Sequence, residues 1–158
     1  MKPLLIISAL LIALITNAQN DSINAEPHNR VKIIQQALIL KGYYVGENGA
    51  GGVFDLGTRE AIIKIQKDTG IPIQFLADSW PKLLNLDKDG NLKFDPIKFM
   101  QQTLLEAGYG NLSVNGIIDN PTKNALNKFR LLNGLPATGN SQLYLDAIFD
   151  LKNKLNKE

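Results

Sequence analysis

The sequence of 158 residues is 44% hydrophobic and 20% charged, an ordinary globular composition that excludes both a disordered chain and a membrane-embedded bundle. The formal net charge is only +2, so the chain lacks the basic surface that binds nucleic acids or anionic bilayers. Cysteine is absent, which excludes disulfides. The one histidine, His28, lies in a predicted flexible lead, so neither a histidine-based zinc site nor a Ser-His-Asp triad is expected.

The first predicted element is a signal peptide over residues 1–18. Lys2 gives a short basic start, residues 4–15 are almost continuously apolar, and Ala18 precedes a plausible cleavage point. The apolar stretch is shorter than the roughly twenty residues that a membrane-spanning helix needs. We therefore expect export with cleavage, a periplasmic or cell-envelope location, and no stable membrane span in the mature chain.

An internal repeat organises the remainder of the sequence. Residues 31–43 recur as residues 97–109, and residues 52–72 recur as residues 116–136. The matched glycines, helix caps and apolar positions predict two copies of one unit. The expected divisions are a flexible lead (19–28), a first module (29–85), a linker (86–94) and a second module (95–158).

Each copy is predicted to begin with a helix. In the first copy, Asn29 is the expected N-cap of a helix over residues 30–41. In the second copy, Asp95 is the expected cap, and Pro96 takes the first helical position, where its missing N–H costs nothing. A glycine that can adopt the left-handed conformation ends each of these helices.

A loop and two further helices follow in each copy. The second helix starts near Thr58 in the first copy and after the expected cap Asn120 in the second. The third helix is short in the first copy, where it begins near Ser79. In the second copy it begins near Ser141, and its apolar residues keep helical spacing almost to the C-terminus. The predicted fold class is all-α: two tandem three-helix modules after a signal peptide.

The repeated residues resemble the peptidoglycan-binding domain of bacterial cell-wall hydrolases. The family pattern Leu-Gln-x-x-Leu-x-x-x-Gly-Tyr corresponds to residues 34–43 and 100–109. The pattern Asp-Gly-x-Phe-Gly-x-x-Thr corresponds, with substitutions, to residues 51–58 and 115–122. The closing tryptophan of the family is Trp80 in the first copy, whereas the second copy has a tyrosine there. The resemblance implies a small helical fold and peptidoglycan as the partner.

Candidate ligand-binding residues lie in and around the loop of each copy. An aromatic residue and a cation stand near the loop mouth, where a tyrosine ring can stack on a sugar and a cation can pair with a peptide carboxylate. Acidic and amide residues stand where the loops depart from the family pattern. The full set is Tyr43, Tyr44, Asp55, Arg59, Tyr109, Asn115, Asp119 and Lys123. The alternative is that the tyrosines pack against the following helix while the cations are only solvated.

No catalytic or metal-binding set is predicted. Asp55 and Asp119 belong to different copies, whereas paired-carboxylate hydrolysis needs two acids across one cleft. Residues 85–90 resemble the start of a calcium loop, but its twelfth position is Pro96 instead of glutamate, which favours a polar turn. His28 is expected to be exposed in the flexible lead.

We therefore predict an exported, non-enzymatic protein that binds peptidoglycan and uses no cofactor. The alternative is a structural or adaptor subunit of an envelope-spanning assembly, such as a secretion system. In that case the degenerate modules contact other envelope proteins, and the extended final helix with its lysine-rich end (residues 152–157) provides part of the contact.

Overall fold

The structure is a computed structural model that describes residues 27–70, 83–136 and 141–158. Within these ranges the regular secondary structure is helical, with one isolated antiparallel bridge between Leu86 and Leu92. The chain divides into two compact units, residues 1–93 and 94–158. The all-α prediction is confirmed. The predicted signal peptide and the short third helix near Ser79 and Trp80 lie outside the described residues.

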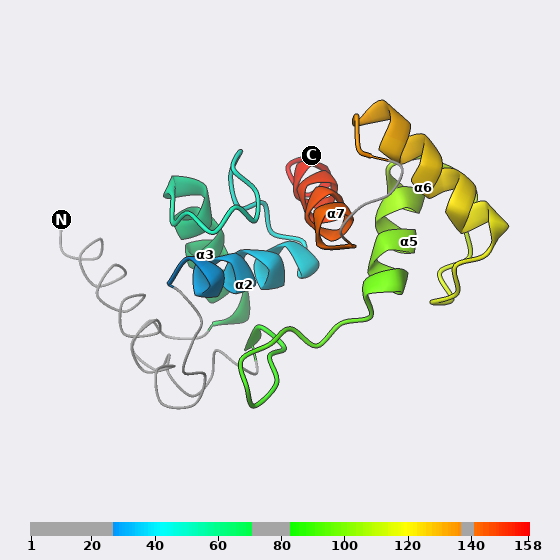
Figure 1. Cartoon of the computed structure of the whole chain (residues 1–158). Coiled ribbons are helices and arrows are strands. Elements are labelled where there is room, and N and C mark those ends of the chain that lie inside the picture. Colours follow the sequence, from blue (N-terminus) through cyan, green and yellow to red (C-terminus); the bar gives the residue numbers. More distant parts are fainter. Residues whose placement is uncertain (1–26, 71–82, 137–140) are drawn as a thin grey trace. The chain divides into compact units, whose positions relative to one another are not determined.

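The first unit contains helices α2 (Pro27–Leu40) and α3 (Leu56–Thr69), which pack against each other (Figure 1). Helix α2 begins earlier than predicted, so Asn29 lies inside it instead of capping it, and His28 belongs to its first turn instead of the lead. A proline is well suited to the first helical position, which explains the earlier start. Apolar side chains of α2, the loop and α3 form the buried interior: Val31, Ala37, Leu38, Ile39, Val45, Ala50, Ala61, Ile62 and Ile65.

The second unit contains helices α5 (Pro96–Glu106), α6 (Asn120–Leu132) and α7 (Ser141–Leu155), and α5 contacts both others (Figure 1). The long final helix that was predicted to begin near Ser141 is confirmed. Five buried side chains from these helices and the α5–α6 loop form the core: Leu104, Leu112, Ala125, Phe129 and Ile148. The unit therefore has a hydrophobic core of its own.

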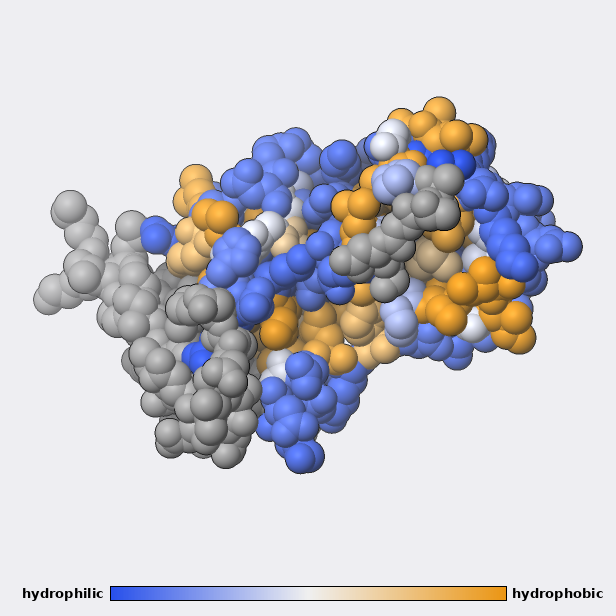
Figure 2. All heavy atoms as spheres, viewed as in Figure 1, coloured by the Kyte–Doolittle hydropathy of each residue, from blue (hydrophilic) through white to orange (hydrophobic). Residues whose placement is uncertain are grey.

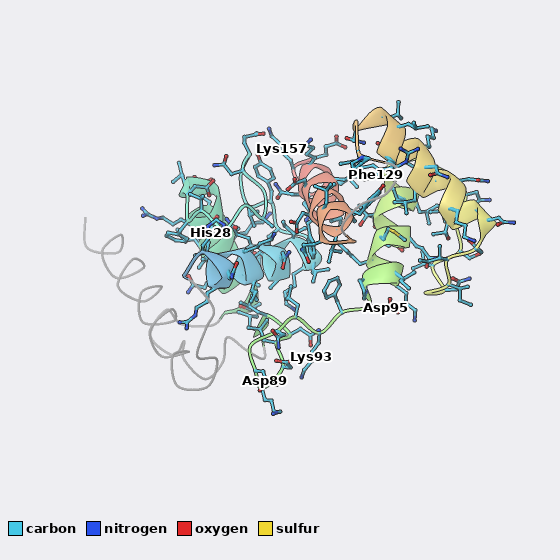
Figure 3. The ribbon with its side chains drawn as sticks, viewed as in Figure 1. His28, Asp89, Lys93, Asp95, Phe129 and Lys157 are labelled. Atoms are coloured by element: carbon cyan, nitrogen blue, oxygen red, sulfur yellow. The ribbon has the colours of Figure 1, made fainter. Side chains whose placement is uncertain are left out.

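Aspartates cap helices α3, α5 and α6. The Asp95 carboxylate caps α5, with Pro96 at the first helical position as predicted, and Figure 3 shows Asp95 at the start of that helix. The cap of α6 is Asp119, whose carboxylate accepts a hydrogen bond from a backbone N–H of the first turn. The prediction that Asn120 is the cap is therefore wrong, because Asn120 is already the first helical residue.

Glycines end α2 and α5 through the same paired hydrogen bonds. The N–H groups of Gly108 and Tyr109 donate to the carbonyls of Leu105 and Leu104, at 3.0 and 2.9 Å. This pair of bonds defines the Schellman motif, and the positive φ of Gly108 (74°) is the conformation that the motif requires. The equivalent bonds form at Gly42 and the following tyrosine in the first unit. The turn therefore sets the direction in which each tyrosine leaves its helix.

The predicted linker contains a tight polar turn. The Asp87 carboxylate accepts hydrogen bonds from the backbone N–H groups of Asp89 and Asn91, both at 2.8 Å. The Asn91 N–H bond is the main reason that the pKa of Asp87 lies below its usual value. The carboxylate thus closes the turn by hydrogen bonds within the chain. The polar turn itself was predicted, and Leu86 and Leu92 pair across it.

Candidate functional site

One buried glutamine in each unit fastens the loop to the first helix. In the second unit the Gln101 amide nitrogen donates to the Ile117 carbonyl at 2.8 Å and to the Thr122 hydroxyl at 3.0 Å. The Gln101 amide oxygen accepts the N–H groups of Asn115 and Gly116, at 3.1 and 2.9 Å. Because both ends of the amide are used, the loop has one preferred conformation relative to α5.

The first unit repeats this arrangement. The Gln35 amide nitrogen donates to the Val53 carbonyl at 2.9 Å and to the Thr58 hydroxyl at 2.7 Å. The Gln35 amide oxygen accepts the Gly52 N–H at 2.8 Å. We call this set of bonds, in either unit, the glutamine clamp. The sequence interpretation did not single out these glutamines, although a glutamine at the same place in both copies was the available signal.

Asp55 is engaged by its own loop and helix. One carboxylate oxygen accepts both the N–H and the hydroxyl of Thr58 at 2.9 Å, and the other accepts the Asn48 amide at 2.9 Å. Burial acts to raise the pKa of Asp55, but the hydrogen bonds from Thr58 and Asn48 outweigh it and bring this pKa below its usual value. Asp55 therefore shapes the loop as an anionic helix cap.

In the second unit Asp119 caps helix α6 and Asn115 accepts hydrogen bonds within the loop. Asp119 accepts the hydroxyl and the N–H of Thr122, at 2.6 and 2.9 Å, and these bonds lower its pKa. The Asn115 side-chain oxygen accepts the Ile117 N–H at 2.8 Å and the Gln101 amide at 3.2 Å. Both candidate residues thus hold the loop in shape.

The tyrosines that follow the Schellman glycines lie against the second helix of their unit. The Tyr43 hydroxyl donates to Asp68 at 3.0 Å, and the Lys64 ammonium lies 5.9 Å from the centre of the Tyr43 ring. Burial is the main cause that raises the pKa of Tyr43. The Tyr109 ring packs edge-on against Phe129 with a centroid distance of 5.3 Å, and Lys128 lies 5.9 Å from it.

The cations beside these two tyrosine rings are therefore Lys64 and Lys128, not the predicted Arg59 and Lys123. The Tyr43 hydroxyl is bound at Asp68, which lies about 13 Å further along α3 than Arg59 at the usual rise per residue. The predicted site thus divides into two parts in each unit. One part is the loop with the start of the second helix, and the other surrounds Tyr43 or Tyr109. The remaining candidate, Tyr44, donates a hydrogen bond from its hydroxyl to the Glu47 carboxylate at 2.7 Å, within the loop of the first unit.

The clamped loop exposes an aliphatic side chain at the same position in both units. Val53 is 55% exposed and Ile117 is 64% exposed, although their carbonyl groups are the ones bound by the buried glutamines. Leu56 in the first unit and Ile118 in the second add further exposed apolar surface. Figure 2 shows hydrophobic side chains gathered over the loop that leads into α6.

Basic side chains border these loops. Arg59 and Lys123 occupy the same place in the first turn of α3 and α6. A Cβ added to Gly116 would meet Cε of Lys98 at 3.3 Å, so the Lys98 alkyl chain lies against the second loop. A Cβ added to Gly52 would meet Nε2 of His28 at 2.8 Å, so this exposed imidazole lies against the first loop, and Figure 3 labels it at the start of α2.

The geometry defines two copies of a small helical module, each with a clamped loop and a capped second helix. The sequence matches the family described as "Putative peptidoglycan binding domain" over residues 27–73 and again over residues 95–141. The two matches together cover more than half of the chain. The chain therefore belongs to this peptidoglycan-binding domain family and carries the domain in tandem, as the resemblance predicted. Membership of a binding-domain family indicates association with the cell wall.

No curated protein and no solved structure matches the chain. Among the helices that the structure describes, none has the length and apolar character required to span a membrane. In the same residue ranges no three acidic or histidine side chains gather in a way that could hold a metal ion.

Proposed function

We propose that the chain is an exported, non-catalytic protein that binds peptidoglycan through both modules. The observation that carries this proposal is the double family match, which coincides with two units that share the same clamped loop. Export is inferred from the apolar stretch over residues 4–15 behind Lys2. These features support a periplasmic or cell-envelope location.

The ligand-binding surface of this proposal is the clamped loop with the first turn of the second helix. Arg59 and Lys123 meet the ligand there, while Asp55, Asn115 and Asp119 hold the loop in its binding shape. The bonds of the three carboxylate and amide side chains within their own modules support this division of roles. The tyrosines Tyr43, Tyr44 and Tyr109 stabilise the modules by their contacts with neighbouring residues.

Co-sedimentation of the mature chain (residues 19–158) with purified peptidoglycan sacculi tests this function. We expect the chain to pellet with the sacculi and to release no soluble muropeptides during incubation. Retention no greater than that of a control protein of similar size and charge would remove the binding proposal, and release of muropeptides would contradict a non-catalytic role.

The predicted export has a separate test. Expression of the full chain with a C-terminal tag, followed by fractionation and intact-mass measurement, should yield a protein that begins at Gln19 and is recovered from the envelope fraction. A cytoplasmic protein that still carries residues 1–18 would contradict export while leaving the domain assignment unaffected.

A second candidate function is an adaptor subunit in an envelope assembly, and an asymmetry between the modules favours it. Leu131 and Leu132 are 68% and 70% exposed at the end of α6, where the first module has the charged residues Lys67 and Asp68. Figure 2 shows hydrophobic side chains at this end of α6. Adjacent exposed leucines are typical of surfaces that contact other proteins.

Crosslinking in cells followed by digestion of the cell wall distinguishes the two functions. The adaptor role predicts a stoichiometric protein partner that remains after digestion and is lost in Leu131→Glu/Leu132→Glu, whereas sacculus binding stays unchanged in that variant. Loss of all crosslinked partners on wall digestion would leave peptidoglycan binding as the function.

A further inference from the structure

The surfaces of the clamped loops point to the part of peptidoglycan that the modules bind. We propose that each module recognises the peptide stems, through their small apolar side chains and free carboxylates, and not the sugar chain. This inference rests on the proposed function and specifies the ligand of the same site. The structural feature that carries it is an exposed aliphatic side chain in the clamped loop, followed by a cation in the first turn of the next helix, at equivalent positions in both modules.

The tyrosines after the Schellman glycines are poor platforms for a sugar ring. Sugars stack on open faces of aromatic rings, but Lys64 lies over the Tyr43 ring and Lys128 over the Tyr109 ring. Tyr109 also packs on Phe129, and the Tyr43 hydroxyl already donates to Asp68. A sugar would have to displace an ammonium group from its cation–π contact before it could stack on such a face.

The side chains of Val53 and Ile117 are not part of the hydrophobic core or of the hydrogen bonds that fix the loop. The matched glutamines and threonines are fully buried and bind the loop, whereas these two side chains remain more than half exposed. The glutamine clamp binds the carbonyl groups of these residues to a buried amide, while their side chains remain in solvent. A ligand with methyl-bearing side chains would remove this apolar surface from water.

The charges around the loop favour a ligand with carboxylates. Lys98 and Lys123 form no salt bridge with any residue that the structure describes. Asp95 and Asp119, which lie close to Lys98 and Lys123, accept hydrogen bonds from the N–H groups at the starts of α5 and α6. Arg59 offers the same positive charge in the first module. A peptide stem brings carboxylates to these cations, whereas the lactyl carboxyl groups of the intact glycan are used in amide bonds to the stems.

Intact sacculi, with soluble glycan strands and soluble stem peptide as competitors, provide the test. An amidase cleaves the amide bond between the glycan and its stems, which frees both competitors and leaves a lactyl carboxylate on each muramic acid of the strands. We expect free stem peptide to displace the mature chain from intact sacculi, and the peptide-free strands to need an at least tenfold higher concentration. Equal competition by both would overturn the inference and leave the proposed function standing. No binding to intact sacculi would contradict the proposed function itself.

Paired charge variants locate the site. Arg59→Gln/Lys123→Gln removes the loop cations, whereas Lys64→Gln/Lys128→Gln removes the same number of charges beside the tyrosines. We expect the first variant to lose at least tenfold in affinity for intact sacculi and the second to bind as the native chain does. The opposite result would place the site at the tyrosines and overturn the inference.

Apolar variants complete the test. Val53→Ser/Ile117→Ser should weaken sacculus binding without changing the circular dichroism spectrum or the thermal midpoint, since neither side chain is buried. If this variant keeps full sacculus binding but no longer co-purifies with a protein partner, the loop docks a protein and the inference is overturned.

Discussion

Gln101 shows how much of a small module can depend on one polar side chain. Its buried amide makes five hydrogen bonds that join the loop to α5 and α6. Gln101→Leu keeps most of the side-chain volume but leaves the loop N–H and C=O groups without this partner. We expect the free energy of unfolding of the second module to fall by about 3 kcal/mol. Urea titration followed by NMR signals of that module measures the change.

The neighbouring Gln102 supplies a matched control. It lies on the same helix but is exposed, and its amide donates only to Glu106, at 2.8 Å. Gln102→Leu should change the free energy of unfolding by no more than about 0.5 kcal/mol. A similar loss in both variants would mean that helix α5, and not the glutamine clamp, is the sensitive feature.

The capping aspartates connect stability with pH. Burial opposes but does not outweigh the hydrogen bonds that lower the pKa of Asp55, and the Thr122 hydroxyl and N–H lower the pKa of Asp119. The unfolded-state value is about 3.9. Since the folded-state pKa lies below it, the caps contribute their full stability above about pH 4 and lose it as the pH falls through the folded-state pKa.

Urea midpoints measured from about pH 6 to about pH 2 test this dependence. Asp55→Asn/Asp119→Asn keeps a side chain that can cap a helix but removes the titrating group. The midpoint of the native chain should fall more steeply with acid than that of the variant, so the difference between them should shrink below about pH 4. A difference that stays constant over this range would contradict the role of the two carboxylates.

At the residue scale, the sequence predicted where the loops lie better than what their polar groups do. The matched glycines and threonines placed both loops correctly. However, Asp55 and Asp119 were interpreted as ligand-binding residues, and the structure uses them as caps. A carboxylate three residues before a buried threonine looks the same in a sequence whether it binds a helix or a ligand, because only the fold decides which way it points.

At the element scale, helix α3 contains a glycine that should resist replacement by alanine. Alanine usually stabilises a helix by about 0.5–1 kcal/mol relative to glycine. A Cβ on Gly57, however, would lie 2.6 Å from the Gly46 nitrogen and 2.7 Å from the Val45 oxygen, and no side-chain rotation can move these backbone atoms. We therefore expect Gly57→Ala to destabilise the first module by about 2 kcal/mol in urea unfolding.

Gly110→Ala is the control for this prediction. Its added Cβ would meet the Ala125 Cβ at 3.7 Å, an ordinary contact, and its φ is not in the left-handed region. The expected change is within about 0.5 kcal/mol. If Gly57→Ala were equally neutral, the loop and α3 would not be packed backbone to backbone as the structure has them.

The sequence predicted the presence of the helices more reliably than the residues at which they begin. The apolar spacing predicted α7 almost to its last residue, because its periodic pattern has no competing signal. Asn29 and Asn120 were chosen as caps because asparagine is a good cap in isolation. In the structure the proline of α2 starts that helix earlier, and Asp119 caps α6 in place of its neighbour.

At the scale of the whole molecule, the tandem architecture could be predicted because the same pattern of glycines, helix caps and apolar residues occurs twice in one chain. The family matches over residues 27–73 and 95–141 confirm both copies. What repetition could not predict is how the copies differ on their surfaces. Leu131 and Leu132 replace a charged pair, and such exposed positions carry no periodic signal because the core does not constrain them.

Two modules with the same ligand should bind a polymer more tightly than the sum of their separate affinities. After one module binds a peptide stem, the second meets neighbouring stems at a high effective concentration, and avidity gains of about 10²–10⁴ are typical. Inactivating the first module with Val53→Ser/Arg59→Gln, or the second with Ile117→Ser/Lys123→Gln, should therefore lower the affinity for intact sacculi more than tenfold. For a soluble single stem, the same variants should halve the stoichiometry and leave the Kd unchanged. Sedimentation with sacculi and titration calorimetry with the stem measure the two effects, and a merely twofold loss on sacculi would show that the modules act independently.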